Sequence, residues 1–381
     1  MRIGIPKERA AGERRVGLTP QAVSLLVEAK NHVYVEAGAG EEAGYADQSY
    51  LDAGAQVVYD PAEAFARAEL IAKIAPLEPE ELPLLMEGQV VFGFHTGMAL
   101  SSEVTKALRG RRITLVSYEW ITEEDGSHPV QSLMSEIAGS VAVLKAVQYL
   151  MSDLGGVGLA PGFVWGVPPA TFVVVGCGVA GGQAVRTAVG IGASVVALDR
   201  DLEQLRELDR VYAGRVVTTM ANSHALDRAV RAADALILAV SEPIRIPLVT
   251  REMVRTMRPR SVLVDLAVAS GGAAETSRPT TPDEPAFLDE GVTHLCVPNL
   301  ASLVGRSASR ALSNVVVGYL LQVAARGRAA LREDPGLRRG TVYEDGFCVN
   351  SEAAPFAERL GDVMGGALGP NGGGAREGRG R

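Results

Sequence analysis

Cysteine is scarce in this chain of 381 residues, which has three: Cys177, Cys296 and Cys348. No pair stands in a C-x-x-C spacing, so we expect free thiols in a reducing cytoplasm rather than a disulfide framework. The cysteines and histidines show no metal-ligand spacing, and no metal site is expected. The sequence also lacks a G-x-S-x-G turn, which disfavours a serine hydrolase.

Long apolar runs and a surplus of basic residues are missing as well. No stretch of about 18 apolar residues occurs, and the N-terminus has no apolar signal core, so we expect a cytoplasmic protein without a membrane partner. The net charge is −8, and the 22% of charged residues interleave both signs along the chain. Without a concentrated basic surface, nucleic acid is not an expected partner.

What the chain does contain is a repeated alternation of strand-like apolar runs and helical patterns. The first set fills the N-terminal part and ends in a Gly/Pro-rich segment, residues 155–170. The alternation restarts at Thr171 with an apolar strand and continues through a complete second set. This pattern predicts parallel sheets covered by helices on both faces.

The order of these sets predicts how the domains are connected. The helical pattern at 307–331 is long enough to return the chain from the second set to the first. We therefore predict an α/β fold of two Rossmann-like, doubly wound domains. Residues 1–130 plus 306–364 form a split domain, residues 131–305 form the domain inserted in it, and the Gly-rich tail 365–381 is disordered.

A glycine-rich turn opens the inserted domain. Gly176, Gly178 and Gly181 form G-x-G-x-x-G directly after an apolar strand and directly before a helix, with Val179 and Ala180 between the last two. The first glycine allows the tight turn, the second lets the backbone approach a pyrophosphate, and the third permits close packing of helix on strand. In this context the motif predicts dinucleotide binding, whereas a purely structural turn is the alternative.

The next strand ends in an acidic residue, as a dinucleotide site requires. Asp199 follows the glycines at about the expected 20 residues, where a carboxylate accepts hydrogen bonds from the adenosine ribose. A 2′-phosphate would be repelled there, although Arg200 beside it would soften the repulsion. NAD is therefore the expected cofactor, with NADP as the alternative.

Further motifs carry a resemblance to a known family. They are, in chain order, "MRIGIPKERAAGERRVGLTP", "MSEIAG", "VVVGCGVAG", "VLVDLA" and "CVPNLAS", and they extend from residue 1 to about residue 350. The chain resembles the alanine dehydrogenase and NAD(P) transhydrogenase α-subunit family, and "MSEIAG" and "CVPNL" are closer to the alanine dehydrogenase branch. The resemblance implies an NAD domain inserted in a split substrate domain, an active site between them, and a homo-oligomer, either dimer or hexamer.

The resemblance also implies further cofactor contacts. The family's NAD contacts match Ser135, Asn299 and Leu300. Val240 ends the fourth strand of the nucleotide domain, at the edge where cofactors lie. For Val240 and Leu300, plain core packing is an equally open interpretation.

On the substrate side, one family residue is retained. The arginine of the family's E-x-R-V motif, which binds the carboxylate of pyruvate or alanine, matches Arg15. A guanidinium grips a carboxylate with two parallel hydrogen bonds, which fixes the substrate relative to the cofactor. The alternative is that Arg15 is a solvated loop charge.

The lysine and histidine positions of the family depart from its pattern. "AKIAP" keeps Lys73 but has Ala75 where the family has its second substrate-binding lysine. The family histidine matches Thr96, and His95 stands one residue early, so its side chain should face the opposite side unless the strand end shifts. His95 is thus either a relocated catalytic group or a packed strand-end residue.

The family aspartate is also missing, since Ala269 occupies its position with Ser270 beside it. We name Ser270, with Arg15, His95, Lys73 and Thr96, as the candidate catalytic set. His128 is either a replacement for the lost acid or base or a plain surface residue of its loop. Without the family's lysine and aspartate, the expected substrate site has two fewer charged groups and more space.

The function predicted from these features is an NAD(H)-dependent oxidoreductase. It acts on a small carboxylate substrate, an amino, imino or 2-oxo acid that is larger or less polar than alanine. The alternative from a different class is a catalytically degenerate NAD-binding paralogue with a regulatory or assembly role.

Overall fold

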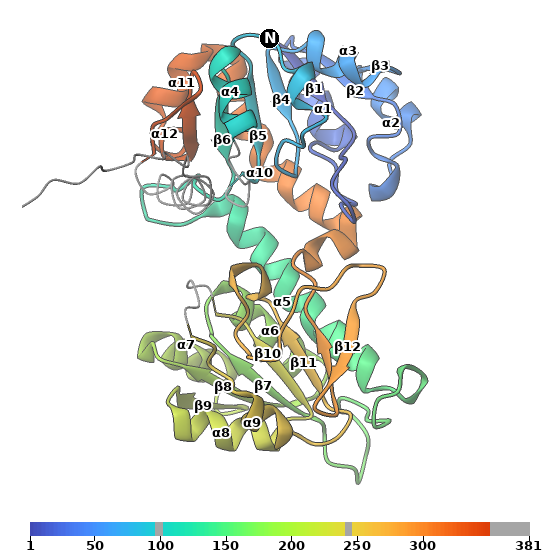
Figure 1. Ribbon diagram of the computed structural model, residues 1–381, viewed down its shortest axis with the longest axis vertical. Coiled ribbons are helices and arrows are strands. Elements are labelled where there is room, and N and C mark those ends of the chain that lie inside the picture. Colours follow the sequence, from blue (N-terminus) through green and yellow to red (C-terminus); the bar gives the residue numbers. More distant parts are fainter. Residues whose placement is uncertain (96–101, 241–245, 351–381) are drawn as a thin grey trace, which may run out of the picture.

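The computed structural model describes residues 1–95, 102–240 and 246–350. Two lobes, each built around one β-sheet, are joined by the long helices α5 (Pro129–Leu150) and α10 (Gly305–Arg326), which pass between them (Figure 1). The expected pair of doubly wound α/β domains is confirmed. Thr96 and the tail 365–381, which was expected to be disordered, lie outside the described residues.

The first lobe contains an eight-stranded sheet in the order β15-β14-β6-β5-β4-β1-β2-β3. Its strands are β1 (Arg2–Ile5), β2 (His32–Glu36), β3 (Gln56–Val58), β4 (Leu70–Ala72), β5 (Val90–Gly93), β6 (Thr114–Ser117), β14 (Thr341–Glu344) and β15 (Phe347–Cys348). Its helices are α1 (Pro20–Glu28), α2 (Asp47–Asp52), α3 (Pro61–Ala66), α4 (Ser102–Gly110), α11 (Arg328–Glu333) and α12 (Pro335–Gly340). The first six strands are parallel, and β14 returns antiparallel to β6.

The second lobe contains a seven-stranded sheet in the order β12-β13-β11-β10-β7-β8-β9. Its strands are β7 (Thr171–Val175), β8 (Ser194–Asp199), β9 (Val216–Met220), β10 (Ala235–Leu238), β11 (Val262–Asp265), β12 (Ala286–Asp289) and β13 (Val292–Leu295). Its helices are α6 (Val179–Gly190), α7 (Leu202–Tyr212), α8 (Ser223–Ala232) and α9 (Arg251–Arg255). Single 3-10 turns are η1 (Glu41–Ala43), η2 (Leu82–Leu84), η3 (Ser152–Leu154), η4 (Val268–Ser270) and η5 (Leu300–Val304).

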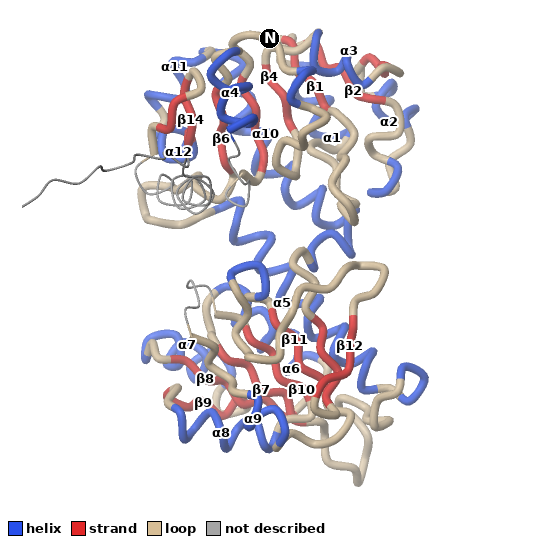
Figure 2. Tube along the Cα trace, viewed as in Figure 1, coloured by secondary structure: helices blue, strands red, loops and turns tan. Residues whose placement is uncertain are grey.

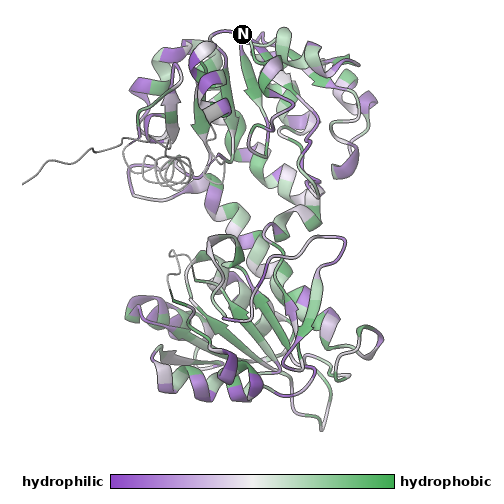
Figure 3. Ribbon diagram, in the orientation of Figure 1, coloured by the Kyte–Doolittle hydropathy of each residue, from purple (hydrophilic) through white to green (hydrophobic). Residues whose placement is uncertain are grey.

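Both sheets are buried in the interior of their lobes. β10 and β11 are buried along their whole length, which is typical of parallel strands with both faces covered. Figure 2 shows the strands of each lobe enclosed by helices. Figure 3 shows that the strands are mostly hydrophobic, whereas hydrophilic residues lie on the outer helices α7 and α8. The carboxyl ends of the parallel strands are therefore the places where loops are free to carry a site.

The helix α5 belongs to the cores of both lobes. Val130 and Met134 pack in the first core, and Val141 and Ala146 pack in the second. The domain division at residues 130 and 305 therefore stays a prediction, because α5 and α10 serve both sides. By length and composition alone α5 is long and apolar enough to cross a membrane, and it is the one such helix in the described part of the chain, although Glu136 and Lys145 interrupt its apolar residues. Its packing between the lobes accounts for that composition.

Candidate active site

The glycine turn between β7 and α6 has the geometry that a bound pyrophosphate needs. Gly176 has φ +89°, a left-handed conformation that favours glycine. A Cβ on Gly181 would lie 1.7 Å from the Gly176 carbonyl oxygen, so the third glycine is required for packing. A Cβ on Gly178 would meet no atom of the described residues within 4 Å. The backbone at Gly178, at the N-terminus of α6, is thus open to an anion, and the turn fits a dinucleotide.

The acidic residue at the end of β8 lies beside this turn. Asp199 accepts a hydrogen bond from the backbone N–H of Cys177 within the glycine turn, and another from the N–H of Asp201 at 2.8 Å. Each carboxylate oxygen keeps a lone pair for a further donor, such as a ribose hydroxyl. Arg200 next to it is exposed. Val179 is half-exposed at the first turn of α6, and Ala180 packs its carbonyl against α5 at Gly139.

The other predicted cofactor residues lie on α5 (Ser135), two residues after β10 (Val240) and at the start of η5 (Asn299 and Leu300). Ser135 is half-buried on α5, and Val240 is partly buried against a core of the second lobe. Leu300 is buried in the other core of that lobe, which agrees with the packing alternative. Asn299 reaches across to the first lobe, where its Nδ2 donates to Oε2 of Glu13 at 3.0 Å. The cofactor roles of these residues stay predictions.

Arg15 is buried in a cluster that spans both lobes. Its Nε donates to Oε1 of Glu13 at 2.7 Å and its Nη2 donates to Oε2 at 2.6 Å, so the two side chains form a bidentate pair. The third nitrogen, Nη1, lies 3.3 Å from the thioether sulfur of Met134 on α5. The guanidinium also lies over the Phe94 ring, 5.5 Å from its centroid, within the range of a cation–π contact. Arg15 is therefore an ordered interior group and not a solvated loop charge.

The structure does not bring Lys73 to this cluster. The Lys73 ammonium is fully buried, donates to Glu81 at 2.6 Å and to the Pro76 carbonyl at 3.0 Å, and lies 3.8 Å from Glu8. The Glu81 carboxylate neutralises the Lys73 charge. Lys73 is thus the centre of a separate buried ion cluster with Glu81 and Glu8, and no contact between Lys73 and Arg15 occurs among the described residues.

His95 also faces away from Arg15. Its neighbour Phe94 packs over the guanidinium, and alternation along the strand turns His95 to the other side, where its ring lies against Gly93. Both ring nitrogens are buried and lack a partner among the described residues. Burial and the Lys73 charge lower the pKa of His95 to about 3, so the imidazole is neutral near pH 7. The packed strand-end interpretation fits this geometry, and the catalytic one would need a rearrangement.

Glu8 is a carboxyl group that the sequence interpretation missed. It follows β1 at the carboxyl edge of the sheet and accepts the backbone N–H of Ile74 at 2.6 Å and of Ala75 at 3.1 Å. Burial raises the pKa of Glu8 to about 7, against the opposing Lys73 charge, and the charges of Glu13 and Glu81 raise it further. Its position at the end of the first strand was the one signal in the sequence that could have indicated it.

Tyr118 connects Glu8 to the Arg15 cluster. Its ring meets Phe94 edge-to-face, with the centroids 5.2 Å apart, and Phe94 in turn underlies Arg15. The Tyr118 hydroxyl is buried and has no hydrogen-bond partner among the described residues. Burial and the nearby Glu8 carboxylate raise the pKa of Tyr118. A polar group without a partner beside a carboxyl indicates a place prepared for a substrate or a water.

Known proteins are similar to this chain in sequence and in architecture. Family models described as alanine dehydrogenase/PNT, N-terminal domain and C-terminal domain match residues 4–138 and 142–351. An alanine dehydrogenase of Methanococcus maripaludis is 40% identical over 344 residues, which cover 89% of this chain and 92% of that protein. A solved L-alanine dehydrogenase structure matches with a TM-score of 0.89 at 38% identity, covering 94% of this chain and 100% of that chain.

The chain belongs to the alanine dehydrogenase/PNT family. A transhydrogenase structure from Sinorhizobium meliloti also matches, with a TM-score of 0.78 at 26% identity, covering 92% of this chain and 100% of that chain. The resemblance stated from the motifs is thereby confirmed. Members of this family are NAD(H)-dependent, which confirms the predicted cofactor class, and the chain is an alanine dehydrogenase-like, NAD-dependent oxidoreductase.

Within this family, the loop after β11 shows one of the departures. Asp265 is buried and accepts the N–H groups of Ala267 and Ala273 at 2.9 and 2.7 Å, which shapes the loop. Ala269 and Ser270 lie exposed on it. No contact of Ser270 with Arg15 occurs in the described part of the chain, so its catalytic role stays a prediction.

His128 is held in place by two polar contacts of its imidazole ring. It stands at the N-terminus of α5, where its Nδ1 lies 3.2 Å from the Thr122 hydroxyl and 3.2 Å from the Glu119 carbonyl oxygen. These contacts hold the loop that enters α5. They agree with the interpretation of His128 as a loop residue.

Proposed function

We propose that this protein is an NAD(H)-dependent oxidoreductase of amino, imino or 2-oxo acids whose substrate carboxylate binds Arg15. One observation supports this most directly. The Glu13 carboxylate holds Arg15 of the first lobe and, through its Oε2, Asn299 of the second. The candidate substrate anchor and a candidate cofactor residue therefore meet at one partly buried carboxylate between the lobes.

The ion pair with Glu13 leaves one nitrogen of the Arg15 guanidinium, Nη1, for a substrate. Glu13 occupies Nε and Nη2, which fixes the plane of the guanidinium. Nη1 faces the Met134 sulfur, a weak acceptor that a carboxylate oxygen would readily replace. Arg15 then orients the substrate, and Phe94 beneath it excludes water from the charged contact.

The cofactor supplies hydride transfer when it is bound, because that chemistry belongs to the nicotinamide. Gly176, Gly178 and Gly181 would hold its pyrophosphate, and Asp199 would hold its adenosine ribose. The protein's own contribution is to place the substrate carbon and to manage the accompanying proton.

Glu8 is the group that we assign to that proton. It lies beside Ala75, where the family lysine is missing, and beside the free hydroxyl of Tyr118. A general acid or base works best with a pKa near the working pH, and burial raises the pKa of Glu8 to about 7. The protonated carboxyl donates during reduction of an oxo or imino acid, and the carboxylate accepts during oxidation.

The altered positions favour a substrate larger or less polar than alanine. Ala75 replaces a long cation and Ala269 replaces a carboxylate, so two charges that would hold a small polar substrate are absent. The relatives named above are alanine dehydrogenases, which makes alanine and pyruvate the reference pair for the test.

The test is NADH oxidation with a panel of 2-oxo acids of increasing side-chain size, each with and without ammonia or a primary amine. We expect turnover that rises from pyruvate to a larger 2-oxo acid. Turnover that is highest with pyruvate and ammonia would contradict the proposal of a substrate larger than alanine, but it would still show that the protein is an enzyme. No turnover with any oxo acid, while NADH still binds, would favour the degenerate paralogue.

A Glu8→Gln variant tests the proton assignment. We expect kcat to fall by about 10²- to 10⁴-fold, the usual effect of losing a positioned acid or base. Wild-type reduction should decline as the pH rises through about 7, where Glu8 loses its proton, and this limb should be absent from the variant. Glu124→Gln, at an exposed loop position, is the control and should keep the wild-type profile.

The same variant has a predictable effect on stability. An unfolded Glu8 releases its proton near its ordinary pKa of 4.5, whereas the folded protein holds it up to about 7. The stability from this group is therefore fully present below pH 4.5 and is lost as the pH rises to about 7. Between pH 4.5 and about 7, the unfolding free energy of the wild type should fall by ~3 kcal/mol more than that of Glu8→Gln. Identical pH dependence of urea unfolding in both proteins would contradict the buried, protonated carboxyl.

We also propose a cytoplasmic homo-oligomer, with an exposed apolar loop as its contact. Trp165 is 100% exposed and Phe163 79% exposed in the loop after α5, with Val164 and Val167 beside them. The apolar residues of α10 are mostly core and do not offer such a contact, since Val316 and Leu320 are fully buried. Trp165→Ser should shift the wild-type species to a smaller one in sedimentation velocity. A wild-type monomer at all concentrations would rule the oligomer out.

A further inference from the structure

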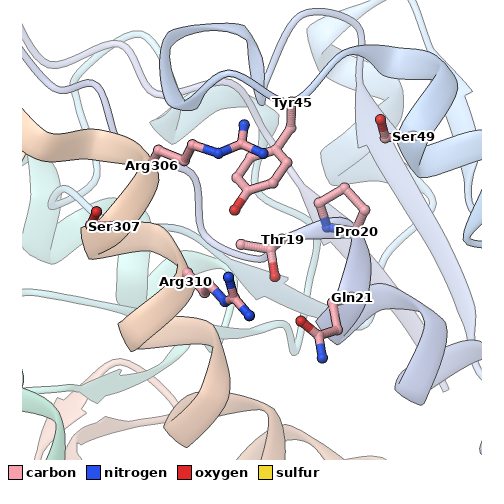
Figure 4. A pocket seen from close by; sticks show the side chains of 8 residues that line it. All are labelled: Thr19, Pro20, Gln21, Tyr45, Ser49, Arg306, Ser307 and Arg310. Carbon is pink, nitrogen blue, oxygen red and sulfur yellow. The ribbon is translucent and has the colours of Figure 1, made fainter.

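A hollow on the first lobe carries two arginines that form no ion pair with a carboxylate of the described residues. Its volume is about 480 Å³, and it is lined by Thr19, Pro20, Gln21, Tyr45, Ser49, Arg306, Ser307 and Arg310. Figure 4 shows that Arg306 and Arg310 come from α10, whereas Thr19 and Gln21 come from the start of α1 on the opposite side. The lining contains two cations and no acidic residue, in a chain whose net charge is −8.

The two arginines stand one helical turn apart on α10, on the same face. Arg306 is held in place: its Nη1 donates to the Gly44 carbonyl at 2.5 Å, and its guanidinium lies 4.6 Å from the Tyr45 ring centroid. Neither contact cancels its charge. Arg310 is exposed, and within the described ranges it has no hydrogen-bond or ion-pair partner. Two like charges this close repel each other, which an anion between them would relieve.

The opposite wall is the N-terminus of α1, which also favours an anion. Pro20 occupies the first turn, and the first turn carries no acidic side chain to balance the helix dipole. The backbone N–H of Gln21 has no acceptor in the part of the chain that the structure describes. A helix end without its cap leaves donors for a ligand.

Thr19 provides the independent sign of a ligand. It is 4% exposed, and its backbone N–H donates to the Ser313 hydroxyl of α10 at 3.0 Å. At the N-cap position a threonine hydroxyl normally accepts a backbone N–H, but here it makes no capping bond. It has no other partner among the described residues, and Figure 4 shows it turned into the hollow between Arg310 and Gln21. The side chain is thus buried except where its hydroxyl meets the hollow, and that hydroxyl is left available to a ligand there.

We propose that this hollow is a binding site for a small doubly charged oxyanion, a phosphate or dicarboxylate group, held between α1 and α10. Arg306 and Arg310 neutralise its charge from one side, and the Thr19 hydroxyl and Gln21 N–H donate from the other. The volume accommodates an anion carried on a small organic molecule and is too large for a lone chloride. The site is separate from the Arg15 cluster and does not depend on the proposed function.

The site is linked to the active site through the chain. Thr19 lies four residues after Arg15, and the intervening segment is tied to α10 by two bonds. The Val16 N–H donates to the Ser309 hydroxyl at 3.0 Å, and the Thr19 N–H donates to Ser313. An anion that bridges α1 and α10 therefore clamps the segment that carries Arg15.

The test is calorimetric titration of inorganic phosphate into the full chain saturated with NADH, so that the glycine turn is already filled, at constant ionic strength. We expect saturable binding to one site per chain and a higher Tm. Arg310→Ala should weaken the affinity at least tenfold and remove the Tm increase. Arg228→Ala is the control, because it removes an exposed arginine from α8, outside the hollow, and should leave the affinity unchanged.

Two further arms decide the outcome. Thr19→Val, which keeps the shape but removes the hydroxyl, should weaken phosphate several-fold, and circular dichroism checks that each variant is folded. Malonate replaces phosphate in a second titration, and binding that is lost in Arg310→Ala identifies a dicarboxylate instead. The proposal is overturned if neither anion saturates, or if Arg228→Ala weakens binding as much as Arg310→Ala does.

Discussion

A Gly178→Ala variant is expected to fold normally and to bind NADH ~10- to 100-fold more weakly than the wild type. The added methyl group meets no atom of the described residues within 4 Å, and the backbone at Gly178 has φ −63°, which alanine tolerates. The loss therefore falls on the ligand, because the methyl group occupies the space where the pyrophosphate would approach. Fluorescence titration with NADH measures the affinity, and thermal unfolding measures the fold.

Neighbouring glycines supply the controls for this result. Gly182→Ala places its Cβ 3.5 Å from the Cys177 carbonyl oxygen, an ordinary contact, and should leave both the Tm and the NADH affinity unchanged. Gly181→Ala would press its Cβ to 1.7 Å from the Gly176 carbonyl oxygen and should destabilise the whole lobe. If Gly178→Ala binds NADH as tightly as Gly182→Ala does, the dinucleotide does not lie on this turn.

Arg15→Lys is expected to lower kcat/KM for the best oxo acid by ~10- to 100-fold. The substitution keeps the positive charge but loses the planar fork, and a hydrogen bond to a charged group is worth about 1.5 to 3 kcal/mol. Arg15→Ala is a poorer test, because it leaves the buried Glu13 carboxylate without its partner, at a cost of ~3–5 kcal/mol in stability. Steady-state kinetics with a 2-oxo acid series measures the effect.

Two companion variants separate substrate binding from stability. The double variant Glu13→Gln with Arg15→Met removes both charges together, so it should unfold near the wild-type temperature while losing oxo-acid turnover. Arg14→Lys, next in the chain and without an ion-pair partner among the described residues, should behave as wild type. Unchanged kcat/KM in Arg15→Lys would show that the substrate carboxylate binds elsewhere.

Much of the fold and the cofactor site could be predicted from local sequence. The glycine turn is specified by residues close in the chain: a left-handed Gly176 and a Gly181 without room for a Cβ depend on the strand and helix beside them. Strand alternation likewise predicts that His95 faces away from Phe94, as the structure shows. Asp199 lies beside the turn because parallel strands bring their carboxyl ends to one edge.

The contacts around the candidate substrate-binding residues could not be predicted from local sequence. Glu13 meets Asn299 across 286 positions of the chain, and Glu8 meets Ile74 across 66. No periodicity specifies such pairs, because they depend on how two lobes and several loops pack together. The same holds for Lys73, which turns out to pair with Glu81 at 2.6 Å and to lie 3.8 Å from Glu8.

The sequence by itself therefore determined the two doubly wound sheets, the family and the nucleotide turn, since each follows from residues within one or two secondary-structure elements. Only the tertiary structure decided which side chains surround Arg15, that Glu8 is a buried carboxyl with its pKa raised to about 7, and that Arg306 and Arg310 face the start of α1. The physical reason is that burial and charge are set by neighbours that the folded chain brings together from distant positions.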